Sequence, residues 1–173
     1  GKELKRPMTM KQRRSRRRIL LLSFFVPLFA LLCLFVQRGI FPFGEESFLR
    51  TDLYHQYAPF FSEFQYKLQH GGSLLYSWDI GLGVNFTANY AYYLASPLNW
   101  FVVLFPKRYV IEFVTLLIVI KTALSSVSMT YYLLRNSSRD GLFAPIFGIL
   151  YAFSAYMAAY SWNVMWLDCT VLF

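Results

Sequence analysis

The sequence is poor in charge, cysteine, glycine and proline. Charged residues make up 15% of its 173 residues, whereas a soluble domain carries about 25%. Two cysteines are too few for a disulfide scaffold, and nine glycines and seven prolines exclude a collagen-like chain. Hydrophobic residues make up 57% of the chain and aromatic residues 20%. This composition also argues against disorder and predicts an integral membrane protein.

The net charge of +8 is concentrated at the N-terminus. Residues 1–18 hold nine basic residues and one acidic residue, and the rest of the chain holds eight of each sign. A nucleic-acid-binding surface interleaves basic and aromatic residues, but here an apolar run follows the basic one directly, so we expect no nucleic-acid partner. The positive-inside rule instead predicts a cytoplasmic tail at 1–18 that contacts membrane lipid.

Three apolar runs predict transmembrane helices. Residues 19–36 contain no charge, and a helix of that length spans about 27 Å, close to the hydrocarbon thickness. The run is too long for a signal peptide, and no pattern of small residues for cleavage follows it. We expect the second helix at 109–134 and the third at 142–160, joined by a polar cytoplasmic loop at 135–141.

This topology places two loops outside the cell membrane, at 37–108 and 161–168, with the N-terminus in the cytoplasm. Residues 90–106 are also uncharged, but Pro97 divides them, so we expect an interfacial segment there rather than a fourth span. Residues 169–173 begin a further apolar segment, which predicts that the chain is the N-terminal fragment of a longer multi-pass protein.

The first outer loop is long and rich in Tyr and Trp, which is typical of a structured layer at the membrane interface. Apolar residues at helical spacing form one stripe along its middle. Pro59 would begin a helix and Gly71 would end it, so we expect a turn at 52–57 and an amphipathic helix at 59–69. The predicted fold is all-α, with three transmembrane helices and an outer loop that carries interfacial amphipathic helices.

Lys121 lies near the middle of the second predicted span. A charge at that depth costs about 2.5–3.5 kcal/mol, so the side chain should face the helix bundle or a wet cavity. Glu112 lies on the opposite helix face, about 13.5 Å away along the axis, and cannot be its partner. The sequence leaves open whether Lys121 forms an ion pair with another segment or binds an anionic group of a substrate.

A series of short motifs resembles one family, the bacterial YfhO membrane proteins, over most of residues 19–173. Each motif is weak alone, but their order and spacing together are fairly specific. Along the chain they are Thr51-Asp52-Leu53-Tyr54, Gln56, Pro59-Phe60, Gly71, Trp78, Gly81-Leu82-Gly83, Asn85, Tyr92-Tyr93, Ser96-Pro97-Leu98-Asn99 and Trp166-Leu167-Asp168.

The resemblance implies the N-terminal part of a polytopic glycosyltransferase of the GT-C type. Such enzymes take a sugar from a polyprenyl-phosphate carrier at the outer face of the membrane. Members of this family are implicated in glycosylating teichoic acids of Gram-positive bacteria. The implied partners are therefore a lipid-linked sugar donor, carried on undecaprenyl phosphate, and teichoic acid or another cell-envelope acceptor.

The same resemblance implies roles for individual residues. The acceptor hydroxyl needs a carboxylate as base, and GT-C enzymes commonly place acids in the first two outer loops, which gives Asp52 and Asp168 as catalytic candidates. The structural alternatives are a helix cap at Asp52 and a polar residue beside an aromatic belt at Asp168. The leaving phosphate needs cations or a divalent metal, and the sequence does not identify which. The candidate substrate-binding residues are Gln56, Trp78, Asn85 and Lys121.

A different class of function stays open. Lys121 and the break at Pro97 would also suit a transporter or flippase subunit, or a non-enzymatic membrane assembly protein. A transporter gathers its polar residues inside the bundle, whereas this sequence concentrates Asp, Gln, Asn and Trp in the predicted outer loops. We therefore expect the enzyme.

Overall fold

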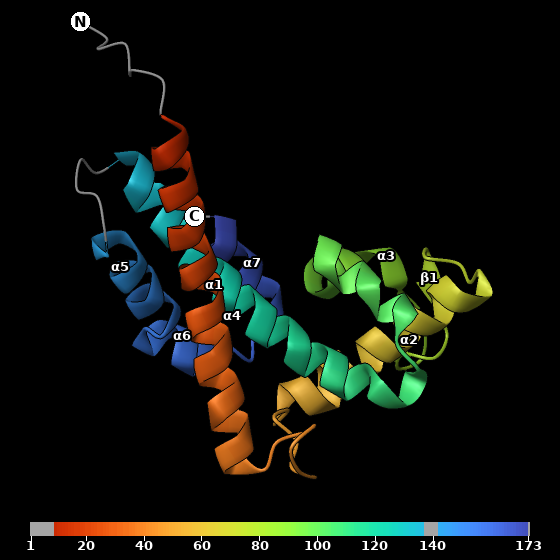
Figure 1. The fold of residues 1–173 in the computed structure, drawn as a ribbon. Coiled ribbons are helices and arrows are strands. Elements are labelled where there is room, and N and C mark those ends of the chain that lie inside the picture. Colours follow the sequence, from red (N-terminus) through yellow and green to blue (C-terminus); the bar gives the residue numbers. More distant parts are fainter. Residues whose placement is uncertain (1–8, 137–141, 173) are drawn as a thin grey trace, which may run out of the picture.

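The computed structural model describes residues 9–136 and 142–172 and is mainly helical (Figure 1). Its long helices form a bundle in which α4 crosses α1 obliquely and also packs against α5 and α7. The bundle helices are α1 (Met10–Arg38), α4 (Val110–Asn136), α5 (Phe143–Ala152), α6 (Ala155–Tyr160) and α7 (Val164–Leu172).

A second group of short elements lies beside the N-terminal end of α4, and we call it the lateral layer (residues 53–109). Its strands pair antiparallel, with Tyr76 opposite Asn85. The layer comprises the π-helix η1 (Leu53–Tyr57), α2 (Ala58–His70), the hairpin β1 (Tyr76–Ser77) and β2 (Val84–Asn85), α3 (Phe86–Asn89), the π-helix η2 (Tyr90–Leu94), and the 3-10 helices η3 (Pro97–Leu104) and η4 (Lys107–Tyr109).

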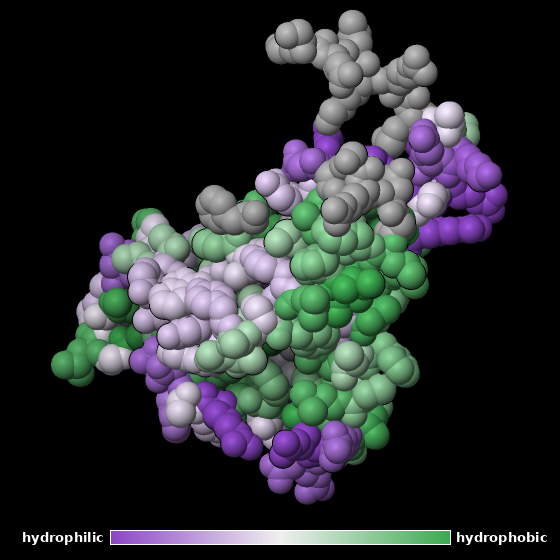
Figure 2. All heavy atoms as spheres, turned by 90° about the vertical axis from the view of Figure 1, so that its left-hand side faces the viewer, coloured by the Kyte–Doolittle hydropathy of each residue, from purple (hydrophilic) through white to green (hydrophobic). Residues whose placement is uncertain are grey.

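Three helical segments are long and apolar enough to cross a membrane: Met10–Arg38, Lys107–Asn136 and Phe143–Tyr160. The prediction of an all-α membrane protein with three such helices is therefore confirmed. Figure 2 shows hydrophobic side chains over the middle of one face of the bundle and hydrophilic ones at its upper and lower ends. The large apolar side chains that α1 and α5 expose include Phe25, Phe29 and Leu150.

Two of these helices differ from the sequence-based expectation. Helix α1 begins at Met10, not at residue 19, because Thr9 and Gln12 form a reciprocal capping box that starts the helix within the basic segment. The third candidate span is not one continuous helix. It breaks after α5, and the Ser154 side chain accepts a hydrogen bond from the Met157 amide (3.4 Å) and so starts α6. Residues 1–8, 137–141 and 173 lie outside the described structure.

Helix α2 confirms the amphipathic helix expected in the first loop. It ends where Gly71 adopts a left-handed conformation (φ 69°), which glycine accommodates without strain. Phe61 and Phe64 of α2 are fully buried, and the ring of Phe61 meets that of Phe113 on α4 at a centroid distance of 5.9 Å. Val164 and Leu167 of α7 belong to the same buried cluster. The lateral layer and the bundle therefore share one hydrophobic core.

The segment at 90–106 forms no single helix and, among the described residues, is not a candidate span. It folds as η2 and η3, and buried Gln65 of α2 fixes it in place. The Gln65 side-chain amide donates to the carbonyl oxygens of Val102 (2.8 Å) and Phe105 (2.6 Å). Because irregular backbone must have its polar groups satisfied, this glutamine anchors η3 on the lateral layer.

Candidate functional site

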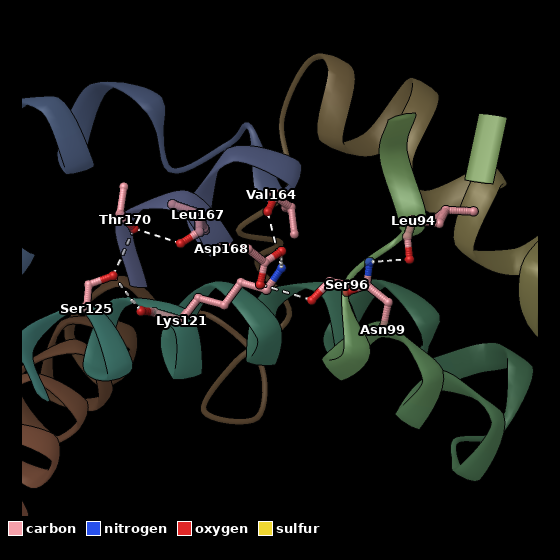
Figure 3. A network of polar contacts seen from close by, with 9 residues as sticks. All are labelled: Leu94, Ser96, Asn99, Lys121, Ser125, Val164, Leu167, Asp168 and Thr170. Carbon is pink, nitrogen blue, oxygen red and sulfur yellow. Dashed lines mark hydrogen bonds and ion pairs between the residues drawn. The ribbon is translucent and has the colours of Figure 1, made fainter. Parts of the chain in front are cut away.

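Lys121 and Asp168 form an ion pair between α4 and α7 (Figure 3). The Lys121 side chain is fully buried, and its Nζ lies 2.8 Å from Asp168 Oδ2 and donates to the Val164 carbonyl oxygen at 3.2 Å. A buried cation needs such a partner. The partner that the sequence could not identify thus lies within this chain, and two predicted site residues meet.

The second oxygen of Asp168 reaches the lateral layer. Ser96, in the link between η2 and η3, donates its hydroxyl to Asp168 Oδ1 at 3.0 Å. The Asp168 carboxylate therefore joins α4, α7 and the lateral layer, while 30% of its side-chain surface stays exposed.

Asp168 stands in a helix, which corrects the expectation of a loop over 161–168. Helix α7 begins at Val164 because Val164 and Leu167 bury their side chains in the shared core. Serines of α4 hold α7 further along its length, since the hydroxyls of Ser125 and Thr170 lie 2.9 Å apart. Helix α7 is thus held against α4 both before Asp168, at Val164, and after it, at Thr170.

A cleft of about 420 Å³ opens beside Asp168. Tyr92, Tyr93 and Ser96 form its wall on the lateral layer, and apolar side chains of α4 and α7 form much of the rest. Among the described residues that line the cleft, Asp168 alone is charged. Lys121 lies behind this carboxylate and is not part of the lining.

Asp52 stands at the N-cap position of η1, yet its side chain caps nothing. Within the described part of the chain, its partly exposed carboxylate makes no hydrogen bond and no ion pair. Thr51, directly before it, has a positive φ of 48°, an uncommon conformation for a residue other than glycine. The helix-cap alternative for Asp52 is therefore not realised, and the carboxylate is available for another role.

Tyr57 connects the surroundings of Asp52 with those of the cleft. It ends η1, is fully buried, and packs edge-on against Tyr93 at a centroid distance of 5.4 Å. Burial raises the pKa of the Tyr57 phenol above its ordinary value, and nearby Tyr93 and Asp52 raise it further. Its hydroxyl lies beside the Met165 backbone without a hydrogen bond of normal geometry in the described structure. Tyr57 therefore stays neutral between the two regions.

The meeting of Tyr57 and Tyr93 also joins two π-helices, η1 and η2. Single π-helical turns are rare in proteins, and many of those that are found lie at functional sites. Asp52 stands at the start of η1, and Tyr93 of η2 lines the cleft. This part of the lateral layer is the best candidate for a site.

The remaining predicted site residues lie elsewhere. Trp78 is 74% exposed and packs against Tyr76 of β1 at a centroid distance of 4.8 Å. Strand β1 lies far from α7 in Figure 1. The Asn85 side chain accepts a hydrogen bond from the Ala88 amide at 3.2 Å and caps α3. Gln56 is exposed on η1, near Asp52. The structure thus does not bring Trp78 and Asn85 to the cleft.

Sequence reasoning assigned no role to three residues that the geometry brings forward: Tyr57, Tyr93 and Ser96. Tyr93 and Ser96 stood in motifs that carry the family resemblance, whereas Tyr57 was one member of an apolar stripe. The described residues contain no group of three or more His, Cys, Asp or Glu that could hold a metal ion. Cys33 and Cys169 are both free and exposed.

Comparison with protein families matches residues 23–173 to the family described as bacterial membrane protein YfhO. This chain belongs to the YfhO family. The match confirms the resemblance drawn from the short motifs, and together with the three apolar helices it supports a location in the membrane. Comparison with curated proteins found no match to this YfhO-family chain, and comparison with solved structures found none either.

Proposed function

We propose that this YfhO-family chain carries catalytic residues of a membrane glycosyltransferase. The enzyme would transfer a sugar from a polyprenyl-phosphate donor to an extracellular acceptor such as lipoteichoic or wall teichoic acid. The observation that carries the proposal is the Asp52 carboxylate, which occupies a helix-cap position and yet has no hydrogen bond or ion pair among the described residues. A partly exposed carboxylate without a structural task suits a general base.

In the proposed reaction, the acceptor hydroxyl attacks the anomeric carbon of the donor sugar. Asp52 takes the proton of that hydroxyl as the new C–O bond forms. The bond between the anomeric carbon and the phosphate oxygen breaks, and the lipid phosphate leaves with the electron pair. Removal of such a base typically slows a reaction by about 10²–10⁴-fold.

The two candidate acids differ in the number of contacts that their carboxylate oxygens make within the protein. Both oxygens of Asp168 are engaged, one by Lys121 and one by Ser96, whereas no described residue engages either oxygen of Asp52. We therefore assign the role of general base to Asp52 and assign Asp168 no role in proton transfer. Tyr57 and Tyr93 lie between the two regions, which supports a shared site.

The test is Asp52→Asn in the full-length protein, with acceptor glycosylation measured at matched membrane abundance. Asparagine keeps the size of the side chain and removes the base, so sugar transfer should fall by about 10²–10⁴-fold while protein abundance stays unchanged. The control is Asp79→Asn, which alters an exposed aspartate of the hairpin. Near-normal transfer by Asp52→Asn would rule out Asp52 as the base.

A further inference from the structure

The carboxylate of Asp168 gives the cleft a negative charge, and the other polar groups of its described lining are neutral. Lys121 is 0% exposed, and its ammonium forms an ion pair with Asp168 and donates a hydrogen bond to the Val164 carbonyl. Its positive charge therefore does not face the cleft. The other side-chain polar atoms among the lining residues are the hydroxyls of Ser96, Tyr92 and Tyr93. A phosphate placed here would meet a carboxylate, whereas a neutral molecule with hydroxyl groups would meet hydrogen-bond acceptors.

We propose that this cleft binds a neutral sugar ring, whose hydroxyls donate to Asp168. The inference rests on the proposed function, which supplies a sugar as substrate. Tyr92 and Tyr93 meet edge to face at a centroid distance of 4.7 Å, and both line the cleft with aromatic surface. Such a combination of apolar wall and a few placed polar groups is typical of a small-molecule site.

The hydrogen-bond count of Asp168 sets how the sugar is held. An ionised carboxylate offers about four acceptor positions. Lys121 occupies one on Oδ2 and Ser96 occupies one on Oδ1, so each oxygen keeps one position for a ligand. Two neighbouring hydroxyls of one sugar ring fit this arrangement. Lys121 and Ser96 act as positioning residues, because they fix the plane of the carboxylate that the sugar contacts.

A neutral sugar could reach the cleft from two sources, the donor lipid or a sugar already attached to the acceptor. Leu98, Leu124 and Val171 give the cleft an apolar wall that continues onto α4 and α7. Both sources present the same ring chemistry to Asp168. Separate KM values for the donor and for the acceptor distinguish the two sources.

The first experiment measures sugar binding by saturation-transfer NMR on the full-length protein in nanodiscs. The probes are methyl β-glucoside, methyl N-acetyl-β-glucosaminide and inorganic phosphate. We expect saturation transfer to at least one glycoside and no response of phosphate. Absence of transfer to both glycosides, or binding of phosphate that competes with them, would overturn the inference.

Variants then locate the binding in the cleft. Ser96→Ala should weaken glycoside binding about tenfold, because the Asp168 carboxylate loses the hydrogen bond that fixes its plane toward the sugar. The double variant Lys121→Met/Asp168→Asn removes both charges, leaves no buried ion unpaired, and should abolish binding. The matched control is Ser125→Ala, which loses a hydrogen bond to Thr170 at the same helix interface outside the cleft. Equal binding by wild type and the double variant would contradict the proposal.

The second experiment measures KM separately for a short-chain polyprenyl-phosphate sugar and for the acceptor. Ser96→Ala should raise one KM with little change in kcat: the donor KM if the cleft holds the donor sugar, the acceptor KM if it holds an acceptor sugar. Unchanged values for both would overturn the inference. Asp52→Asn separates the two proposals, because it should lose transfer and still bind glycosides. Glycoside binding that depends on Ser96, combined with normal transfer by Asp52→Asn, would refute only the assigned base.

Discussion

The ammonium of Lys121 lies 2.8 Å from the carboxylate of Asp168, which stands 47 residues further along the chain. The pair is asymmetric, because Lys121 is fully buried and Asp168 keeps 30% of its side-chain surface exposed. The buried cation therefore depends on Asp168, and Asp168 is the member that remains available to a ligand.

A double-mutant cycle should show this dependence. Asp168→Asn leaves the buried Lys121 ammonium unpaired, which typically lowers the free energy of unfolding by about 3–5 kcal/mol. Lys121→Met leaves a carboxylate that is 30% exposed and should cost less. The double variant should lose less than the sum of the two single variants, since it leaves no charge unpaired. Thermal unfolding in a mild detergent measures the three variants against wild type. Additive losses would show that the two residues are not coupled.

Gln65 should matter more than Gln69, although both donate from α2 to carbonyl oxygens of η3. Gln65 is 1% exposed and bonds to Val102 and Phe105, whereas Gln69 is exposed and bonds to Val103 at 3.1 Å. Gln65→Leu should lower the free energy of unfolding by about 1–3 kcal/mol, because a buried carbonyl loses its partner. Gln69→Leu is the matched control and should cost less than about 0.5 kcal/mol. Limited proteolysis within η3 reports the loss of anchoring, and equal sensitivity of the two variants would contradict it.

Alkaline pH should reveal the burial of Tyr57. The unfolded phenol ionises near pH 10, whereas the folded phenol keeps its proton, because burial raises its pKa. Stability should therefore fall as the pH rises above about 10, since the native state then holds a proton that the unfolded state has lost. Tyr57→Phe should show a smaller fall between pH 9 and 11 and near-wild-type stability at pH 7. Thermal unfolding across this range measures both, and identical pH profiles would refute the assignment.

The topology can be tested with single cysteines in a background that lacks Cys33 and Cys169. Cysteine at Glu45 or at Ser161 should react with an impermeant thiol reagent added outside intact cells, while cysteine at Ser15 should not. The reason is that the basic start of α1 favours the cytoplasm, and two further helical segments of membrane length follow. Labelling at Glu45 without labelling at Ser161 would place Asp52 and Asp168 on opposite sides and exclude a shared site.

Much of the fold could be predicted from local patterns. The charge-free run of α1, the long apolar run of α4 and the stripe of α2 that ends at Gly71 each have a signature in neighbouring residues. The start of α1 at Met10 also has a local signature, the capping box of Thr9 with Gln12. The dense basic residues that follow predict a tail and hide this helix start. The break between α5 and α6 could not be predicted, because a continuous apolar composition does not show where one helix ends and the next begins.

The candidate site was less predictable, since it depends on contacts between distant segments. The cost of burying Lys121 predicted that it has a partner, but not that the partner is Asp168. Asp168 was expected in a loop, because nothing nearby in the sequence shows that α7 is stabilised by burial against α4 and the lateral layer. Ser96 can donate its hydrogen bond to Asp168 only because α7 lies against the link between η2 and η3.

The shared core implies that α2 and α7 pack together at a late stage of protein synthesis. Phe61 and Phe64 of α2 pack in one cluster with Val164 and Leu167 of α7, which the ribosome adds about a hundred residues later. At roughly 5–20 residues per second, this takes on the order of 5–20 s. Throughout that interval the aromatic side of α2 exists without its last partners. The packing of the lateral layer is therefore completed only after α7 has been synthesised.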